Sequence, residues 1–374
     1  MQACTLVVLG AGSSSRFNHK TKKQWIRIEN DPLWLNTTNR LSKYYNFSKV
    51  IVVGNKNELK YMKNYNNSFT YVVGGSSRQE SMSNALSIVD TKYVMVTDVA
   101  RACVPKDVID RLIDNIGQAD CIVPILKVSD TVVYNDNTIN RDDVKLIQTP
   151  QLSNTTILKE ALKTTEEFTD DSSAIKIAGG SIKYIEGSIK SAKLTFGEEL
   201  NTLVCLKSPS TDMFVGTGYD IHPFEDNKQM VLGGVKIDSE FGFKAHSDGD
   251  VLIHSVIDAI LGSIGAGDIG EFFPDTDQKY KNASSVKMLE EIMDFTTNVG
   301  YELVNVDITI IAQIPKINPH KDDIKSKMAQ ILNLPNNKVN IKATTAEKLG
   351  FIGRCEGVAV QSIATVKYYN WKEN

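Results

Sequence analysis

The chain has 374 residues, five cysteines and a formal net charge of −3 at pH 7. This length exceeds the size at which a single hydrophobic core keeps growing, so two domains are expected. Acidic and basic residues are interspersed without a broad basic region, which disfavours nucleic acid and membrane surfaces as partners and favours small molecules.

The cysteines and the N-terminal residues indicate a cellular compartment. Cys4, Cys103, Cys121, Cys205 and Cys355 have no paired spacing, which argues against a disulfide framework and a cysteine-rich zinc site. We therefore expect buried thiols in a reducing environment. The opening MQACTLVVLG lacks a basic leader and is too short an apolar run for a signal peptide, and no later segment resembles a membrane span. These features predict a cytoplasmic protein.

The first half of the chain alternates short β-branched runs with amphipathic segments. Strands are expected at 4–9, 49–54, 69–74, 93–98 and 120–126, a hairpin arm near 131–139, and helices at 33–45, 57–65, 78–89, 153–165 and 197–207. Strands that are apolar on both faces and joined by helices form a parallel sheet covered on each side. This half is predicted to be a Rossmann-like α/β domain with a mainly parallel sheet.

The polar segment KSPSTDM separates two regions with different patterns, so we expect a first domain at 1–207, a linker at 208–212 and a second domain at 213–374. In the second domain strands are expected at 213–222, 229–237, 301–313, 338–346 and 357–369, and helices at 250–264, 284–299 and 320–333. This order predicts an α+β domain in which helices cover one face of a mainly antiparallel sheet.

The first candidate site is the loop LGAGSSSRFNHKTKKQ after the first strand. It begins like a dinucleotide fingerprint but lacks the third glycine at the required place, which disfavours a nicotinamide enzyme. Its small residues let backbone N–H groups approach phosphate oxygens, and Arg16 and Lys23 supply cations, which suits a triphosphate. The alternative is an ordinary tight turn with solvent-facing basic residues.

Two more loops, VVGGSSRQES and VTDVAR, follow strands of the same sheet. Ligands of open parallel sheets bind at the carboxyl ends of the strands, so these loops should meet the first one there. An aspartate in such a place is often only a helix cap, and Asp98 alone therefore decides nothing. The residues expected to converge at this edge are Arg16, Lys23, Gly75, Ser81, Asp98 and Arg101.

These loops, together with QTPQL, the aspartate pair at 170–171 and AKLT at 192–195, resemble the 2-C-methyl-D-erythritol 4-phosphate cytidylyltransferase family over essentially residues 1–207. In that family the phosphate of methylerythritol phosphate attacks the α-phosphorus of CTP and pyrophosphate leaves, with Mg²⁺ or Mn²⁺ on the triphosphate. The resemblance implies that Arg16, Lys23 and Lys193 stabilise charge that develops at phosphorus.

The same resemblance implies binding roles for other residues. Gly75 and Ser81 match positions that hold cytosine, and Asp98 matches one near the ribose and the metal. The positions that match those holding methylerythritol phosphate, partly across a dimer interface, are Arg101, Thr131 and Arg141. The chain departs from the family's usual residues at Lys22, Val99 and Ala102, and none of these changes removes a charged group.

The second candidate site begins at GYDIHPF, residues 218–224. On a strand, residues two apart project from the same face, so Asp220 and His222 can converge on one ion. Such a pair is also common as a surface carboxylate beside a hydrogen-bonded histidine. A third ligand is offered by AHSDGDVLIHSVIDAILG, in which Asp250, His254 and Asp258 recur on one face of a helix.

Two histidines and a carboxylate, here Asp220, His222 and His254, match a zinc site with an open fourth position. Asp258 is either a solvated helix charge or a residue that supports a ligand. The loop GAGDIGEFFPDTD carries glycines and carboxylates that can hold hydroxyls or a second cation. In KATTAEKLGFIGR, neighbouring hydroxyls suit phosphate and the glutamate suits Mg²⁺.

These strings, with IAQIPKINPH between them, resemble the 2-C-methyl-D-erythritol 2,4-cyclodiphosphate synthase family over about residues 212–374. In that family the 2-phosphate attacks the β-phosphorus of the CDP group, closes a cyclic diphosphate and expels CMP. The resemblance implies zinc on the two histidines and Asp220, a second divalent ion (Mg²⁺ or Mn²⁺) on Glu347, and catalysis by Thr345. It implies substrate contacts at His246, Asp250, Asp268, Gly270, Asp275, Asp277, Ala312, Lys316, Thr344, Phe351 and Arg354.

Together the two resemblances imply a bifunctional enzyme of the non-mevalonate isoprenoid pathway. A kinase step separates its two reactions, so association with that kinase is a hypothesis. Dimers in the first family and trimers in the second imply a homo-oligomer, with C-terminal trimers joined by N-terminal dimer contacts into a hexamer. The alternative is a sugar nucleotidyltransferase fused to a zinc-stabilised trimerisation module, which nucleotide and acceptor screening would distinguish.

Overall fold

The computed structural model describes residues 2–164, 166–245, 247–274, 276–280 and 283–373. The chain forms two compact units: unit 1 is Met1–Pro209 with Asn370–Asn374, and unit 2 is Ser210–Tyr369. The division falls inside the segment expected to be the linker. Residues Asn370–Asn374, expected in the second domain, group with unit 1. No helix of the described residues is long and apolar enough to cross a membrane.

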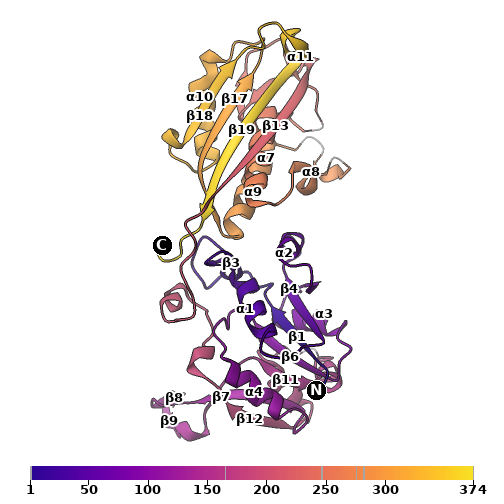
Figure 1. The fold of residues 1–374 in the computed structure, drawn as a ribbon, viewed down its shortest axis with the longest axis vertical. Coiled ribbons are helices and arrows are strands. Elements are labelled where there is room, and N and C mark those ends of the chain that lie inside the picture. The colour runs from indigo at the N-terminus through magenta and orange to yellow at the C-terminus, as the bar shows by residue number, and fades with distance from the viewer. Residues whose placement is uncertain (1, 165, 246, 275, 281–282, 374) are drawn as a thin grey trace. The chain divides into compact units, whose positions relative to one another are not determined.

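The centre of unit 1 is an eight-stranded sheet (Figure 1). Its hydrogen-bonded order is β10-β7-β11-β6-β1-β4-β5, and β12 pairs with β7. The strands are β1 (Cys4–Leu9), β4 (Lys49–Gly54), β5 (Thr70–Val73), β6 (Tyr93–Asp98), β7 (Cys121–Lys127), β10 (Lys145–Ile147), β11 (Gln151–Asn154) and β12 (Ile182–Glu186). The pairs β6–β1, β1–β4, β4–β5 and β7–β12 are parallel, which confirms the predicted mainly parallel α/β sheet.

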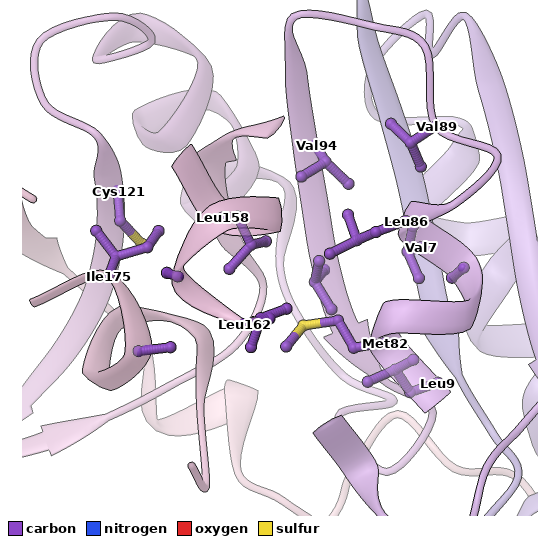
Figure 2. Packing of buried hydrophobic residues seen from close by; sticks show 14 of the residues in the cluster. Val7, Leu9, Met82, Leu86, Val89, Val94, Cys121, Leu158, Leu162 and Ile175 are labelled. Carbon is purple, nitrogen blue, oxygen red and sulfur yellow. The ribbon is translucent and has the colours of Figure 1, made fainter. Parts of the chain in front are cut away.

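Helices cover both faces of this sheet. The helices are α1 (Leu33–Ser42), α2 (Leu59–Tyr65), α3 (Arg78–Leu86), α4 (Lys106–Asp114), α5 (Thr155–Ala161) and α6 (Asp171–Ile177). Met82 of α3 and Leu158 of α5 belong to one buried cluster with strand residues such as Val7 (Figure 2). Cys121 also belongs to this cluster, while the next residue, Ile122, projects from the opposite face and is equally buried.

Shorter elements complete unit 1. They are the strand pairs β2 (Arg27–Ile28) with β3 (Asp31–Pro32) and β8 (Val132–Tyr134) with β9 (Asn137–Ile139), and the 3₁₀ helices η1 (Lys23–Trp25), η2 (Arg141–Asp143), η3 (Ile189–Ser191) and η4 (Gly197–Asn201). The helix predicted at 197–207 is therefore wrong beyond the short η4. Its buried leucines, Leu200, Leu203 and Leu206, are three residues apart, a spacing that also fits a 3₁₀ turn followed by irregular chain.

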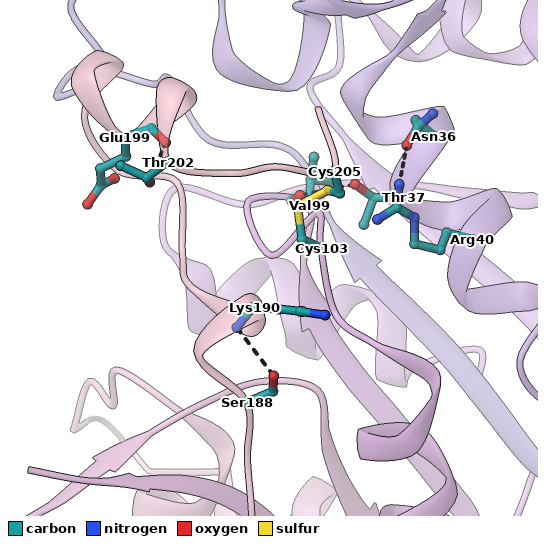
Figure 3. Close-up of a disulfide and its surroundings, with 10 residues drawn as sticks. All are labelled: Asn36, Thr37, Arg40, Val99, Cys103, Ser188, Lys190, Glu199, Thr202 and Cys205. Atoms are coloured by element: carbon teal, nitrogen blue, oxygen red, sulfur yellow. Dashed lines mark hydrogen bonds between the residues drawn. A yellow bond between two sulfur atoms is a disulfide. The ribbon is translucent and has the colours of Figure 1, made fainter. Parts of the chain in front are cut away.

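A disulfide joins Cys103 to Cys205, with their Cα atoms 5.7 Å apart (Figure 3). The expectation that all five cysteines are free thiols is therefore wrong for Cys103 and Cys205. The two residues are 102 positions apart in the sequence, so only the folded chain shows that they are neighbours. The other cysteines are free, with Cys4 and Cys121 buried and Cys355 partly buried.

Unit 2 contains a five-stranded sheet in the order β16-β13-β19-β17-β18. Its strands are β13 (Met213–Asp226), β16 (Phe241–Phe243), β17 (Tyr301–Ile311), β18 (Val339–Thr344) and β19 (Gly357–Tyr368), and its helices are α7 (Val251–Ile264), α8 (Ile269–Phe272), α9 (Ser285–Asn298), α10 (Lys321–Ile331) and α11 (Gly350–Gly353). Every pair except β17–β18 is antiparallel. Together with the helices, this confirms the predicted α+β domain. Short 3₁₀ helices are η5 (Gln278–Tyr280), η6 (Asn318–His320) and η7 (Asn336–Lys338).

The strand predicted at 229–237 is instead a hairpin, β14 (Met230–Leu232) and β15 (Val235–Ile237). Its two central residues, Gly233 and Gly234, have φ values of +60° and +74°. Two successive left-handed residues form the tight turn whose twist matches a hairpin, and glycine adopts them without strain.

Helix α7 lies very close to β13. Gly216 and Gly218 face this helix, and a Cβ atom at either position would overlap backbone atoms of α7, namely the carbonyl oxygens of Ala259 and Ser255. The even-numbered residues of β13 share this face, because successive side chains of a strand alternate. Asp220 and His222 therefore project towards α7, while odd-numbered residues such as Tyr219 project from the other face.

The end of the chain packs into unit 1 through Trp371. Its indole is 3% exposed, and its Nε1 donates to the carbonyl oxygen of Arg27 at 2.7 Å. Unit 1 is therefore built from two separate stretches of sequence.

Candidate active sites

A cavity of about 760 Å³ lies beyond the carboxyl ends of β1, β5 and β6 in unit 1. This is the edge at which an open α/β sheet binds ligands, and the volume falls within the range of small-molecule sites. Six of the predicted site residues line it: Arg16, Lys23, Gly75, Ser81, Asp98 and Lys193.

Hydrogen bonds within the first loop give it a defined shape. Ser14, with φ of +60°, donates from Oγ to Gln24 Oε1 at 2.9 Å and accepts from the backbone N–H of Lys23 at 3.1 Å. Gln24 in turn donates to the carbonyl oxygen of Gly12 at 3.1 Å. These bonds close the glycine- and serine-rich segment against the residues that follow it.

The Lys23 ammonium lies between two parts of the site. It donates to the carbonyl oxygen of Leu194 at 2.8 Å, next to Lys193. Burial, and then repulsion from Lys193, lower the pKa of Lys23 to about 8. An anionic ligand would favour the charged form, so this lysine is suited to a phosphate.

Two cationic side chains pair with the carboxylate of Asp98. Its two oxygens accept from Arg78 at 3.3 Å and from Lys193 at 2.8 Å. Burial would raise the pKa of Asp98, but Arg78 and Lys193 outweigh it and hold the pKa below its usual value. Asp98 therefore remains ionised and orients the Lys193 ammonium.

Sequence reasoning missed Arg78 and Asp171 as members of this site. Arg78 Nη1 donates to Asp171 Oδ1 at 3.0 Å, and Asp171 is fully buried. Arg78 thus joins Asp171 at the start of α6 to Asp98 at the end of β6. Both residues stand in the quoted strings GGSSRQES and DD, but nothing in the sequence shows that they meet.

Three predicted residues lie outside the cavity lining: Arg101, Thr131 and Arg141. Arg101 donates to Thr149 Oγ1 at 3.0 Å and to the carbonyl oxygen of Ser191 at 2.6 Å. Thr131 and Arg141 are exposed beside the β8–β9 hairpin. Their roles in binding methylerythritol phosphate stay predictions.

At Lys22, one of the three departures from the resemblance, the ammonium pairs with Glu58, a residue only 2% exposed. Glu58 also accepts from Trp25 Nε1 at 2.6 Å. Val99 and Ala102, the other two departures, are buried apolar residues. All three substitutions are accommodated without removing a charge from the cavity.

In unit 2, Asp220, His222 and His254 form the predicted cluster. His222 Nε2 and His254 Nδ1 lie 3.1 Å and 3.3 Å from Asp220 Oδ2, and one candidate ligand atom from each residue lies within 4.8 Å of the others. Burial would raise the pKa of Asp220, but the neighbouring imidazoles of His222 and His254, when protonated, outweigh burial and hold that pKa far below its usual value. Two imidazoles and a carboxylate so arranged fit a divalent metal.

The other ring nitrogen of His222 supports this assignment. Its Nδ1 lies 2.9 Å from the carbonyl oxygen of Gly249, which can only accept, so Nδ1 carries the proton. In the neutral imidazole, Nε2 then presents its lone pair to Asp220 Oδ2. Two lone pairs directed at each other repel unless a cation lies between them. His222 is therefore suited to bind a metal ion through Nε2.

Asp250 and Asp258 on the same helix have structural contacts. Asp250 is fully buried and caps α7, and its oxygens accept from the backbone N–H groups of Ile253, Gly233 and Gly234. Burial raises the pKa of Asp250 to about 6. Asp258 accepts from the backbone N–H of Ile269 at 2.8 Å, which fixes the loop before α8. The substrate contact predicted for Asp250 stays a prediction.

A second group of predicted residues meets at the ends of β17 and β18. These strands are parallel, and the backbone N–H of Ala312 donates to the carbonyl oxygen of Thr344 at 3.0 Å. Thr345 Oγ1 donates to Glu347 Oε1 at 2.7 Å. Lys316, Thr344, Thr345 and Glu347 are exposed there, so they are accessible to a ligand.

The remaining predicted residues that the structure describes lie on other loops and short helices of unit 2. Asp268 caps α8, Gly270 lies within that helix, and Asp277 accepts from the backbone N–H of Lys279. Phe351 and Arg354 lie on and just after α11, where Arg354 pairs with Glu356. His246 and Asp275 lie outside the described residues.

Comparison with known proteins identifies the family. A model described as 2-C-methyl-D-erythritol 4-phosphate cytidylyltransferase matches residues 4–204, and the YgbB family model matches residues 213–367. The bifunctional enzyme IspD/IspF of Aliarcobacter butzleri (strain RM4018) is 65% identical over 369 residues, 99% of either chain. The chain belongs to the bifunctional IspD/IspF family.

Other IspD/IspF proteins agree over the full length. The enzyme of that name from Campylobacter concisus (strain 13826) is 50% identical over 99% of either chain. The solved structure of the bifunctional IspDF from Campylobacter jejuni matches with a TM-score of 0.88 and 48% identity, covering 99% of this chain and 100% of that one.

An IspD/IspF chain combines a cytidylyltransferase with a cyclodiphosphate synthase, so this protein is a nucleotidyltransferase and a lyase of non-mevalonate isoprenoid biosynthesis. Unit 1 corresponds to the first activity and unit 2 to the second. These matches favour the bifunctional reading over a sugar nucleotidyltransferase joined to a trimerisation module.

The lowered pKa of Lys23 predicts that the cytidylyltransferase activity depends on pH. Because its pKa is near 8, the ammonium loses its proton as the pH rises through 8, and kcat/KM for CTP should fall there. The Lys23→Arg variant should lose this alkaline limb, since guanidinium stays charged. The measurement is pyrophosphate release as a function of pH. CMP release by the same variant serves as the control, and an unchanged alkaline limb in Lys23→Arg would contradict the assignment.

Proposed function

We propose that each unit performs its reaction at the site described above: unit 1 with Arg16, Lys23 and Lys193, and unit 2 with the Asp220–His222–His254 cluster. The observation that carries the proposal is that both groups gather charge where phosphates can be bound. The cluster of unit 2 is assigned to Zn²⁺. Mg²⁺ or Mn²⁺ is assigned to the triphosphate in unit 1 and to Glu347 in unit 2.

In unit 1, a phosphate oxygen of methylerythritol 4-phosphate attacks the α-phosphorus of CTP. The bond from that phosphorus to the oxygen bridging to the β-phosphate breaks, and pyrophosphate leaves with the electron pair. Negative charge spreads over the phosphoryl oxygens, and cations already in place stabilise it. Arg16, Lys23 and Lys193 supply them, and Asp98 holds Lys193 in position. Mg²⁺ or Mn²⁺, when bound, would neutralise further charge on the triphosphate.

In unit 2, an oxygen of the 2-phosphate attacks the β-phosphorus of the CDP group and CMP leaves, which closes the cyclic diphosphate. A divalent ion held by Asp220, His222 and His254 would act there as a Lewis acid. Thr345 contributes a hydroxyl for the phosphate, and Glu347, which accepts from that hydroxyl, supplies a carboxylate for a second ion. Ala312, Lys316 and Thr344 border the place assigned to the cytidine phosphate.

Two variants of the whole chain test both assignments. Lys193→Met should lower pyrophosphate release from CTP and methylerythritol phosphate by about 10²–10³-fold, the usual cost of removing one charge-stabilising donor. His222→Ala should abolish CMP release from the phosphorylated CDP product. Each variant is the control for the other, because each should keep the activity of the intact unit.

A metal chelator should stop CMP release, and Zn²⁺ should restore it in the wild type but not in His222→Ala. Full pyrophosphate release by Lys193→Met would contradict the role of that lysine. If His222→Ala instead dissociates the oligomer, the structural reading of the metal is favoured over the catalytic one.

The uncovered face of the unit 2 sheet supports an oligomer. Odd-numbered residues of β13, among them Met213, Val215 and Tyr219, are 64%, 63% and 53% exposed. Exposed apolar side chains gathered on one face of a strand in this way mark an interface. In addition, the metal cluster on β13 and the Thr344 loop after β18 are separated by β19 and β17, about 14 Å at the usual strand spacing. A site shared between subunits, in a trimer, would bring complementary groups together.

In unit 1 the β8–β9 hairpin exposes Val133 and Tyr134, at 61% and 66%. We assign it to a dimer contact, which joins the trimers into a hexamer. Tyr219→Glu should then leave dimers and Tyr134→Glu should leave trimers, as measured by sedimentation or light scattering. A hexamer that survives both substitutions would contradict this arrangement.

A phosphorylation separates the two reactions. We therefore also propose that this protein associates with the kinase that performs it. A pull-down with the intact chain that recovers no kinase, together with no rate advantage over separate units, would contradict the association.

A further inference from the structure

The two histidines of the unit 2 cluster are held in different ways. His222 uses its second nitrogen to bind a backbone carbonyl, that of Gly249. His254 instead directs Nε2 at a side chain, the hydroxyl of Ser285, at 3.0 Å. Ser285 is fully buried at the first residue of α9, so the contact links two helices across the site.

The hydroxyl of Ser285 is itself engaged on its other side. Its Oγ donates to Asp248 Oδ1, and its backbone N–H donates to Asp248 Oδ2 at 3.0 Å. A carboxylate accepts and does not donate, so the single proton of the hydroxyl goes to Asp248. Towards His254, the oxygen of Ser285 can therefore only accept.

This direction fixes the tautomer of His254. If Ser285 accepts, Nε2 carries the proton, and in the neutral ring Nδ1 presents its lone pair to the cluster, 3.3 Å from Asp220 Oδ2. A hydroxyl backed by a carboxylate is also a stronger acceptor than an isolated one, which makes the imidazole a better ligand.

We propose that Ser285 and Asp248 are positioning residues for the metal: a relay from His254 Nε2 through the Ser285 hydroxyl to Asp248 orients the His254 ring and directs Nδ1 at the ion. The inference rests on the proposed metal site and adds to it two residues that neither the ligand set nor the substrate contacts include.

A second hydroxyl provides the alternative route. Ser247 Oγ lies 3.3 Å from the same Nε2, but it accepts from the backbone N–H of Gly249 at 3.1 Å and, among the residues that the structure describes, has no carboxylate partner. The shorter contact and the carboxylate favour Ser285. A purely structural reading is that Asp248 and Ser285 only tie the loop before α7 to α9, which would affect stability and not the metal.

The test uses the full chain and Zn²⁺ alone, without substrate. Zn²⁺ affinity is measured by competition with a chromophoric chelator, and the site geometry by the visible spectrum of the Co²⁺-loaded protein. Ser285→Ala should bind Zn²⁺ about 10–100-fold more weakly, the usual cost of removing such a partner. Its Co²⁺ spectrum should change, and Ser285→Thr, which keeps the hydroxyl, should recover both.

Ser255→Ala is the matched control. Ser255 is equally buried in α7, next to His254 in sequence, but its hydroxyl bonds to Ser362 at 2.6 Å. It should keep wild-type Zn²⁺ affinity. If Ser285→Ala does not fold, Asp248→Asn tests the same relay, because an amide gives the hydroxyl a weaker acceptor.

The possible outcomes distinguish a failure of the proposed relay from a failure of the proposed metal site. If the wild type binds Zn²⁺ and His222→Ala does not, the metal site stands. Wild-type affinity in a folded Ser285→Ala or Asp248→Asn would then overturn the relay, as would a loss confined to Ser247→Ala. A wild type that binds neither Zn²⁺ nor Co²⁺ would overturn the site and the relay together.

Discussion

The close approach of α7 to β13 brings the Asp220–His222–His254 cluster of unit 2 together. Gly216 and Gly218 remove the side chains that would hold the helix away, so the even-numbered face of β13 meets α7 directly. Asp220 and His222 continue that face, and His254 lies on the helix opposite them. A larger residue at either glycine would move the helix and separate the ligands. Two residues without side chains thus decide whether three others can share one ion.

In unit 1, the arrangement of the site depends on charged side chains and not on glycines. Several cations stand near one another in the cavity, and burial together with repulsion from Lys193 lowers the pKa of Lys23. Asp98 offsets part of that repulsion by accepting from Arg78 and Lys193. The buried Asp171 holds Arg78 from the other side. The cavity is therefore organised without a ligand, which would lower the reorganisation needed in the proposed reaction.

The sequence predicted what local patterns can encode. The loop after the first strand pointed to Arg16 and the end of a later strand to Asp98, and both line the cavity. The spacing of Asp220 and His222 predicted a cluster that the structure brings together with His254. The sequence did not reveal Arg78 with Asp171, or Ser285 with Asp248, because these contacts join segments 93 and 37 positions apart. The Cys103–Cys205 pair was missed for the same reason. The hairpin at Gly233 and Gly234 is different, since a Gly-Gly pair between apolar runs is a turn signal that the strand prediction overlooked.

Trp371 affects how the two activities can be separated. Unit 1 needs a tryptophan that is encoded after the whole of unit 2, and its indole fills a buried position next to Arg27. A gene cut at the linker would yield a first fragment with an exposed cavity where that ring belongs. Separate enzymes made in this way would differ from the fused ones in folding as well as in connection. A circularly permuted chain, in which the last residues precede the first, would keep the contact between Trp371 and Arg27. It would therefore be a better comparison for the fused enzyme than a chain cut at the linker.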